Sequence, residues 1–233
     1  MERSGKRLFP RRGTFEIVFA ALCASLAIFM TLYKVVFAFP IIPYLKFELA
    51  EIPVVIAFLA AGPFSGLLSS VIYWVILTLV GEWTPIGPAM KFLAVAPTVL
   101  GLWAGFALSR RLRKNPSIAF SMVMGIVLAM VARVVVTSLM NLLVLWWLFP
   151  FFLDMAAKYL SATVGFQAES PFAVLVVTLV FTALFNILHM FLSVIPSYYL
   201  VSKVITRVKP VSARGAWFQT TLSETSISKG SGE

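Results

Sequence analysis

The decapeptide Tyr44-Leu-Lys-Phe-Glu-Leu-Ala-Glu-Ile-Pro53 joins two long apolar runs and carries three charges, Lys46, Glu48 and Glu51. Prolines at positions 40, 43 and 53 disfavour a continuous helix through it. One interpretation is a solvated loop that leads into a helix at Glu51, where a carboxylate suits the positive helix N-terminus. The other is a lid that faces a ligand.

The composition around this stretch indicates the fold class. Of 233 residues, 61% are hydrophobic and only 12% are charged. Soluble globular domains do not have this composition, and a transmembrane barrel would show short alternating segments instead of long apolar runs. The sequence therefore predicts an all-α polytopic membrane protein. A net charge of +10 would suggest nucleic acid in a soluble protein, but no nucleic-acid partner is expected because of where the charges lie.

Most positive charges gather before the first apolar run, in one short loop, and after the last run. These three clusters are Arg3, Lys6, Arg7, Arg11 and Arg12; Arg110, Arg111, Arg113 and Lys114; and Lys203, Arg207, Lys209, Arg214 and Lys229. Loops rich in lysine and arginine stay on the cytoplasmic side of a membrane. Both termini are therefore predicted to be cytoplasmic, in a multi-pass protein of the cell membrane that contacts lipid.

The apolar runs predict six transmembrane helices. Their approximate ranges are 14–38, 51–62, 67–80, 89–109, 115–148 and 171–205. The second run is short for a span, which needs about 20 residues. Residues 150–170 are expected to form an outer segment with a short interfacial helix. The chain thus divides into a basic cytoplasmic leader (1–13), a six-helix membrane domain (14–207) and a flexible cytoplasmic tail (208–233).

Ionisable and amide side chains inside the spans are candidate functional groups, because burying them in a membrane costs free energy. Arg133, Thr137 and Asn141 follow at i, i+4 and i+8 and share one helix face over about 12 Å. Asn186 and His189, at i and i+3, also share a face.

Together with Lys91 and the decapeptide, these groups can line one cavity that opens to the outer face. Asparagine and histidine offer donors and acceptors for a neutral heterocycle or a polyol. Structural alternatives exist: Arg133 can pair with an acidic side chain or helix carbonyls, and the asparagines can bond neighbouring helices for roughly 1 kcal/mol. His189 is the only histidine, so no metal site is predicted.

No enzyme signature is found in the sequence. It has no P-loop, no HExxH and no GxSxG. We therefore expect no enzymatic activity, and energy for any transport must come from an ion gradient or from another subunit.

Ala20, Ala24 and Ala27 form a face of small residues on the first helix, at i, i+4 and i+7. Such faces let another helix approach closely in lipid. The approaching helix can belong to this chain or to a partner.

The chain resembles the substrate-binding S components of energy-coupling factor (ECF) vitamin transporters, closest to the riboflavin-specific RibU type. The resemblance rests on Pro43-Tyr-Leu-Lys-Phe-Glu-Leu-Ala-Glu-Ile-Pro53 followed by Gly62-Pro-Phe-Ser-Gly66. The Ala20/Ala24 pair, the Arg133 to Asn141 spacing and the Phe185-Asn186 pair add to it. It covers about residues 15–207.

Several positions depart from the riboflavin type. Glu48 and Glu51 stand where aspartate is usual, Lys91 replaces the asparagine of an Asn-Phe pair, and His189 stands where lysine is common. Another small heterocyclic vitamin is therefore an alternative ligand. A stand-alone ion-coupled carrier is a second alternative, although it would want an inverted repeat that is not seen.

The resemblance implies a pocket between the last three predicted helices, covered by the Lys46–Glu51 loop. It implies no cofactor, since riboflavin would be the transported ligand. It also implies docking through Ala20 and Ala24 to a transmembrane coupling subunit that works with two ABC-type ATPase subunits. Leucine at either alanine is expected to spare ligand binding and abolish uptake. The predicted substrate-binding residues are Lys46, Glu48, Lys91, Asn141, Asn186 and His189.

Overall fold

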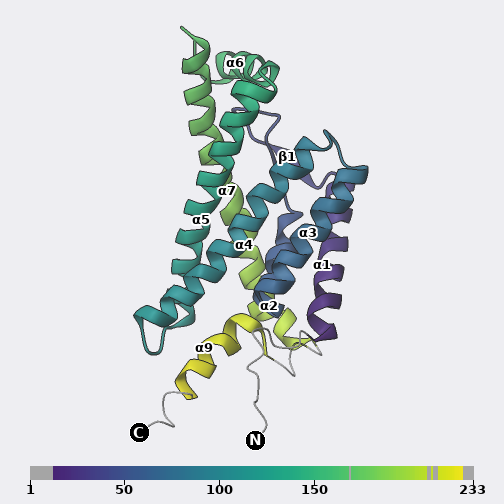
Figure 1. Cartoon of the computed structure of the whole chain (residues 1–233), viewed down its shortest axis with the longest axis vertical. Helices are drawn as coiled ribbons and strands as arrows, with labels where there is room; N and C mark the ends of the chain where they lie inside the picture. Colours follow the sequence, from purple (N-terminus) through teal and green to yellow (C-terminus); the bar gives the residue numbers. More distant parts are fainter. Residues whose placement is uncertain (1–12, 168, 209–210, 212–214, 228–233) are drawn as a thin grey trace, which may run out of the picture.

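The structure is a computed structural model, and it describes residues 13–167, 169–208, 211 and 215–227. Long helices run side by side and form an elongated bundle (Figure 1). The start of α1 (Thr14–Leu32) and α9 (Trp217–Ile227) lie at one end, and α6 (Phe151–Val164) lies at the other (Figure 1).

The first predicted helix is shorter than expected, because it ends at Leu32 instead of continuing to position 38. The chain turns at Lys34, whose φ of 53° lies in the left-handed region. Strand β1 (Val36–Ala38) then pairs antiparallel with β2 (Lys46–Glu48), with Phe37 opposite Phe47. This small hairpin is the one departure from an all-α architecture in the described part of the chain.

Helix α2 (Glu51–Ala61) begins at the expected glutamate and has 11 residues. At 1.5 Å per residue it is about 16 Å long, roughly half the hydrocarbon thickness of a bilayer. The segment before α2 packs against α6 and α7, because Phe39, Ile42 and Phe47 are buried in a cluster with side chains of these two helices. The hairpin is thus packed into the bundle.

The remaining helices follow the predicted order with shifted ends. They are α3 (Pro63–Val80), α4 (Ile86–Leu112), α5 (Ile118–Leu143) with the π-helical turn η1 (Val144–Leu148), α6, and α7 (Pro171–Lys203) with the 3₁₀ turn η2 (Ile205–Arg207). Among the described residues, five helices are long and apolar enough to cross a membrane: α1, α3, α4, α5 with η1, and α7 with η2. The remaining predicted span, the second along the chain, corresponds to the short helix α2.

Helices α4 and α5 approach closely through glycines. A Cβ atom built on Gly101 would lie 2.3 Å from the Ala129 Cα, and one on Gly105 would lie 2.3 Å from the Gly125 Cα. Neither position can accept a side chain without separating the helices. This crossing fixes α4 against α5, which carry opposite sides of the polar site described below.

The described part of the predicted C-terminal tail, residues 211 and 215–227, packs against the bundle. Val211, Ala216, Phe218 and Leu222 are buried and belong to the main hydrophobic cluster. The ring of Trp217 packs on Phe58 of α2 at 5.1 Å and on Phe106 of α4 at 5.6 Å between centroids. This C-terminal segment therefore covers the end of α2.

Trp217→Ala is expected to lower the free energy of unfolding by about 1–2 kcal/mol and to lower the thermal unfolding midpoint accordingly. The effect is modest because the segment can detach without unfolding the bundle. Cys23 is the only cysteine of the chain and is buried, so reaction with a thiol-specific dye on heating reports unfolding. Trp147→Ala is the control, since this tryptophan is 74% exposed. Equal midpoints for the two variants would show that the segment does not brace α2.

Candidate functional site

Arg133 lies at the centre of a buried polar network. Its side chain, on α5, is 1% exposed and makes a two-pronged ion pair with Glu51 of α2. The Nη1 atom donates to Oε2 at 2.7 Å and Nη2 donates to Oε1 at 2.9 Å. This planar arrangement is the strongest form of an arginine–carboxylate pair. It confirms the interpretation of Arg133 as the partner of an acidic side chain.

The other donors of the guanidinium are also engaged. Nε donates to the Asn186 Oδ1 at 3.0 Å, and Nη1 lies 3.4 Å from the Thr98 hydroxyl. Ser193 donates to Glu51 Oε2 at 2.9 Å. The network therefore ties together α2, α4, α5 and α7, and it satisfies both buried charges, as burial requires.

His189 links this network to the hairpin. Its Nδ1 lies 3.3 Å from the Arg133 Nη2, which carries only hydrogens to donate, so Nδ1 accepts. In a neutral ring the proton then resides on Nε2. That N–H donates to the backbone carbonyl of Glu48 at 2.9 Å, and the Glu48 backbone nitrogen lies 3.2 Å from the same ring nitrogen. His189 thus contacts Arg133 with one ring nitrogen and the backbone of strand β2 with the other.

The Glu48 carboxylate points away from His189, toward α4. Lys91 Nζ lies 2.7 Å from Oε1 and 2.8 Å from Oε2. The Thr31 hydroxyl of α1 lies 3.4 Å from Oε2 and 2.7 Å from the Tyr73 hydroxyl of α3. Glu48 therefore joins the buried network on its backbone side to a second polar group on its carboxylate side.

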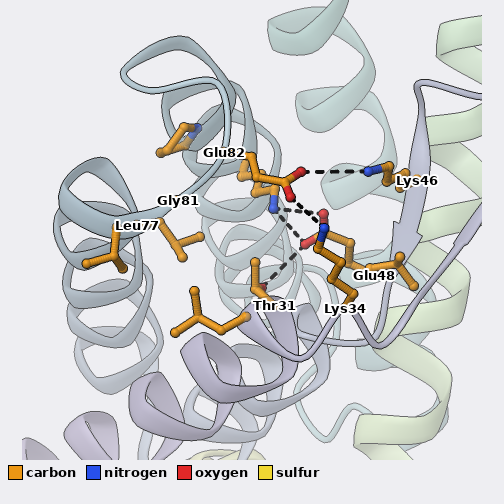
Figure 2. Close-up of a pocket in the computed structure, with 12 residues that line it drawn as sticks. Thr31, Lys34, Lys46, Glu48, Leu77, Gly81 and Glu82 are labelled. Carbon is orange, nitrogen blue, oxygen red and sulfur yellow. Dashed lines mark hydrogen bonds and ion pairs between the residues drawn. The ribbon is translucent and has the colours of Figure 1, made fainter.

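A pocket of about 180 Å³ opens beside this carboxylate, and Figure 2 shows its lining. The Lys34 and Lys46 side chains approach Glu82 from two sides, at 2.8 and 3.9 Å (Figure 2). The hydrogen bond and charge of Lys34 lower the pKa of the Glu82 carboxyl from its ordinary value. The pocket thus presents ammonium and carboxylate groups from the hairpin, from α4 and from the loop after α3.

The predicted substrate-binding residues fall into three groups. Lys46, Glu48 and Lys91 line the pocket. Asn186 and His189 are buried in the adjacent network, where the Asn186 Nδ2 also donates to its own helix. Asn141 lies apart, since its one side-chain hydrogen bond in the described structure runs to the Thr137 carbonyl of the same helix at 2.7 Å.

Ala20 and Ala24, predicted to dock a partner, have no exposed surface. Helix α1 packs against α2 and α3, so the small-residue face serves contacts within the chain. A partner cannot touch these side chains in this arrangement. Their part in docking remains a prediction, and leucine at either position would first disturb the packing of α1.

Four residues of the site and its surroundings are not predicted from the sequence: Thr31, Lys34, Glu82 and Ser193. Nothing in their spacing marks them, because each comes from a different element and meets the site only after folding. Across the residues that the structure describes, there is no group of three or more histidine, cysteine or acidic side chains that could hold a metal ion.

Comparison with known proteins identifies the family. Residues 15–198 match the family described as ECF transporter, substrate-specific component. The chain belongs to this family. It is thus a substrate-specific membrane component of a transporter. Membership of the family implies that the protein partners with ECF transmembrane and ATPase modules and that its ligand is a vitamin.

Two relatives of this ECF component are informative. It is 25% identical over 154 residues to the riboflavin transporter RibU of Staphylococcus aureus (strain TCH60), covering 66% of this chain and 77% of the relative. A solved S component of a bacterial ECF transporter superposes with a TM-score of 0.62 at 20% identity, covering 84% of this chain and 98% of that structure. The structural likeness supports the fold.

Proposed function

We propose that this protein is the substrate-binding subunit of an ECF-type vitamin uptake transporter and that riboflavin is its ligand. The family match carries the first part of the proposal. The substrate rests on the likeness to a riboflavin transporter. The polar pocket beside the hairpin supports the first part, because it offers convergent charged groups at one end of an apolar bundle.

The proposed topology places both termini in the cytoplasm. Counting the hairpin segment with α2 as one crossing gives six crossings, which puts the basic clusters on one side as the positive-inside rule requires. The pocket then faces outward. A coupling subunit and two ABC-type ATPases would supply the energy, since this sequence contains no P-loop.

Lys46, Glu48 and Lys91 are proposed to contact the ligand, because their charged groups line the pocket. Asn141, Asn186 and His189 were predicted contacts as well, but Asn186 and His189 have their polar atoms engaged in the network. Small-molecule sites usually measure about 300–1,000 Å³. A three-ring ligand would therefore require the hairpin or the loop after α3 to move outward.

The experiment is to purify the protein in detergent and record its absorption spectrum, together with that of any small molecule released by heat. A flavin spectrum, or quenching of added riboflavin fluorescence with saturation, is expected. A colourless protein that fails to quench riboflavin would contradict the flavin assignment. It would leave the family intact and direct the search to other heterocyclic vitamins, for which the departures at Lys91 and His189 already give a reason.

Lys91→Met is expected to weaken riboflavin binding by about 10- to 100-fold, the loss that follows when one charge-assisted hydrogen bond is removed. It also leaves the Glu48 carboxylate without its cation. Fluorescence titration measures the change in Kd. Lys158→Met, on α6 and outside the pocket lining, is the control. An unchanged Kd for Lys91→Met would show that the ligand binds elsewhere.

A further inference from the structure

We propose that His189 is a positioning residue: it fixes strand β2 over the pocket through the Glu48 backbone and does not itself contact the ligand. The proposal rests on the proposed function for what the pocket binds. Its structural claim, that one histidine tautomer anchors the hairpin, stands without a ligand.

The ring of His189 has no free polar atom. Nδ1 faces Arg133 at 3.3 Å, and Nε2 faces the Glu48 backbone, with the carbonyl oxygen at 2.9 Å and the nitrogen at 3.2 Å. His189 is only 4% exposed. A ligand that hydrogen-bonded to either nitrogen would have to replace Arg133 or release the hairpin.

The surroundings of the ring are also occupied. Phe47 meets it edge-on with centroids 5.6 Å apart, and Phe185 lies 5.3 Å away. These two phenylalanines contact each other at 4.7 Å, so the three rings form one cluster between β2 and α7. Stacking of a flavin on His189 is therefore blocked by aromatic side chains of the protein itself.

The hydrogen bond from His189 holds the hairpin in its position against the helices. Two strands of three residues each are at best marginally stable alone, so their place depends on anchors to the helices. The Glu48 backbone is held by His189, and the Glu48 carboxylate is held by Lys91. Fixing Glu48 from both sides also sets Lys46, two residues earlier on the same strand.

The ring chemistry gives a matched pair of variants. His189→Gln places an amide N–H near the position of Nε2 and can still donate to the Glu48 carbonyl. His189→Asn is shorter and keeps a polar group only near Nδ1, beside Arg133. Both lose the aromatic contacts equally, so a difference between them reports the bond to the hairpin.

The first readout needs no ligand. A spin label on Phe37→Cys, an exposed residue of β1, is introduced in a Cys23→Ala background and reports hairpin mobility. We expect the glutamine variant to keep a spectrum close to that of the His189 protein and the asparagine variant to show a mobile label. Equal mobility in both variants would overturn the anchoring role, whether or not riboflavin is the ligand.

The second readout is riboflavin affinity by fluorescence titration. The asparagine variant is expected to lose about tenfold in affinity and the glutamine variant no more than about threefold, in line with the loss of one hydrogen bond. If both variants lost affinity equally while the label stayed immobile, His189 would be a direct ligand contact and the proposal would be wrong. If the unsubstituted protein bound no riboflavin, the proposed substrate would fail while the mobility result still decided the anchoring role.

Discussion

Arg133→Met is expected to lower the stability of the bundle by about 3–5 kcal/mol, because it leaves the Glu51 carboxylate buried without a cation. Glu51 is 6% exposed, and its oxygens are held by Arg133 and Ser193. Methionine retains the length of the side chain but supplies no donor. Dye labelling of Cys23 during heating measures the loss. Val135→Met is the control, since it lies on the same helix and is 52% exposed.

The double variant Glu51→Leu with Arg133→Met sharpens this test. Removing both charges leaves no unpaired ion, so stability is expected to recover in large part. Riboflavin binding is expected to be weak in the double variant, because His189 then loses its contact with Arg133. A double variant as unstable as Arg133→Met alone would mean that the damage came from lost packing and not from an unpaired charge.

The polar network shows what the sequence could predict. An arginine in an apolar helix must find a partner, so its importance follows from membrane energetics alone. Its partner could not be named with certainty, because Glu51 is separated from it by 82 residues. Asn141 shares a helix face with Arg133 by spacing, but its side chain bonds the Thr137 carbonyl of its own helix and not the network. Its contact with a ligand stays a prediction.

The hairpin could not be predicted from local pattern. The residues after Leu32 are apolar and read as more helix, and only the pairing of Val36–Ala38 with Lys46–Glu48 makes them a strand. The C-terminal segment shows a similar limit of local pattern. Its serine and threonine content suggests flexibility, but Val211, Phe218 and Leu222, in its described part, are buried in the main hydrophobic cluster.

Gly105→Ala is expected to cause the loss of most folded protein. The added Cβ would lie 2.3 Å from both the Cα and the N of Gly125. Backbone atoms cannot rotate away as a side chain can, so α4 and α5 must separate. Close approach through small residues is the main source of helix association in lipid, and this substitution removes it.

Gly125→Ala is the matched control at the same crossing. A Cβ there would meet the Leu102 side chain and carbonyl at 3.3 Å, a contact that small shifts can relieve. We expect a drop in the unfolding midpoint of a few degrees for this variant, typical of a loss of about 1 kcal/mol. Size-exclusion profiles and Cys23 labelling compare the two. Equal yields of folded protein would contradict the close crossing.

The different effects expected for Gly105→Ala and Gly125→Ala bear on function, because the crossing of α4 and α5 positions residues of the site. Helix α4 carries Thr98 and Lys91, and α5 carries Arg133. If the helices part at Gly105, the Thr98 contact to the guanidinium is lost and Lys91 moves relative to Glu48. Any folded remnant of Gly105→Ala should therefore bind riboflavin more weakly than folded Gly125→Ala. Equal affinities in the folded fractions would show that ligand binding does not depend on how closely α4 packs on α5.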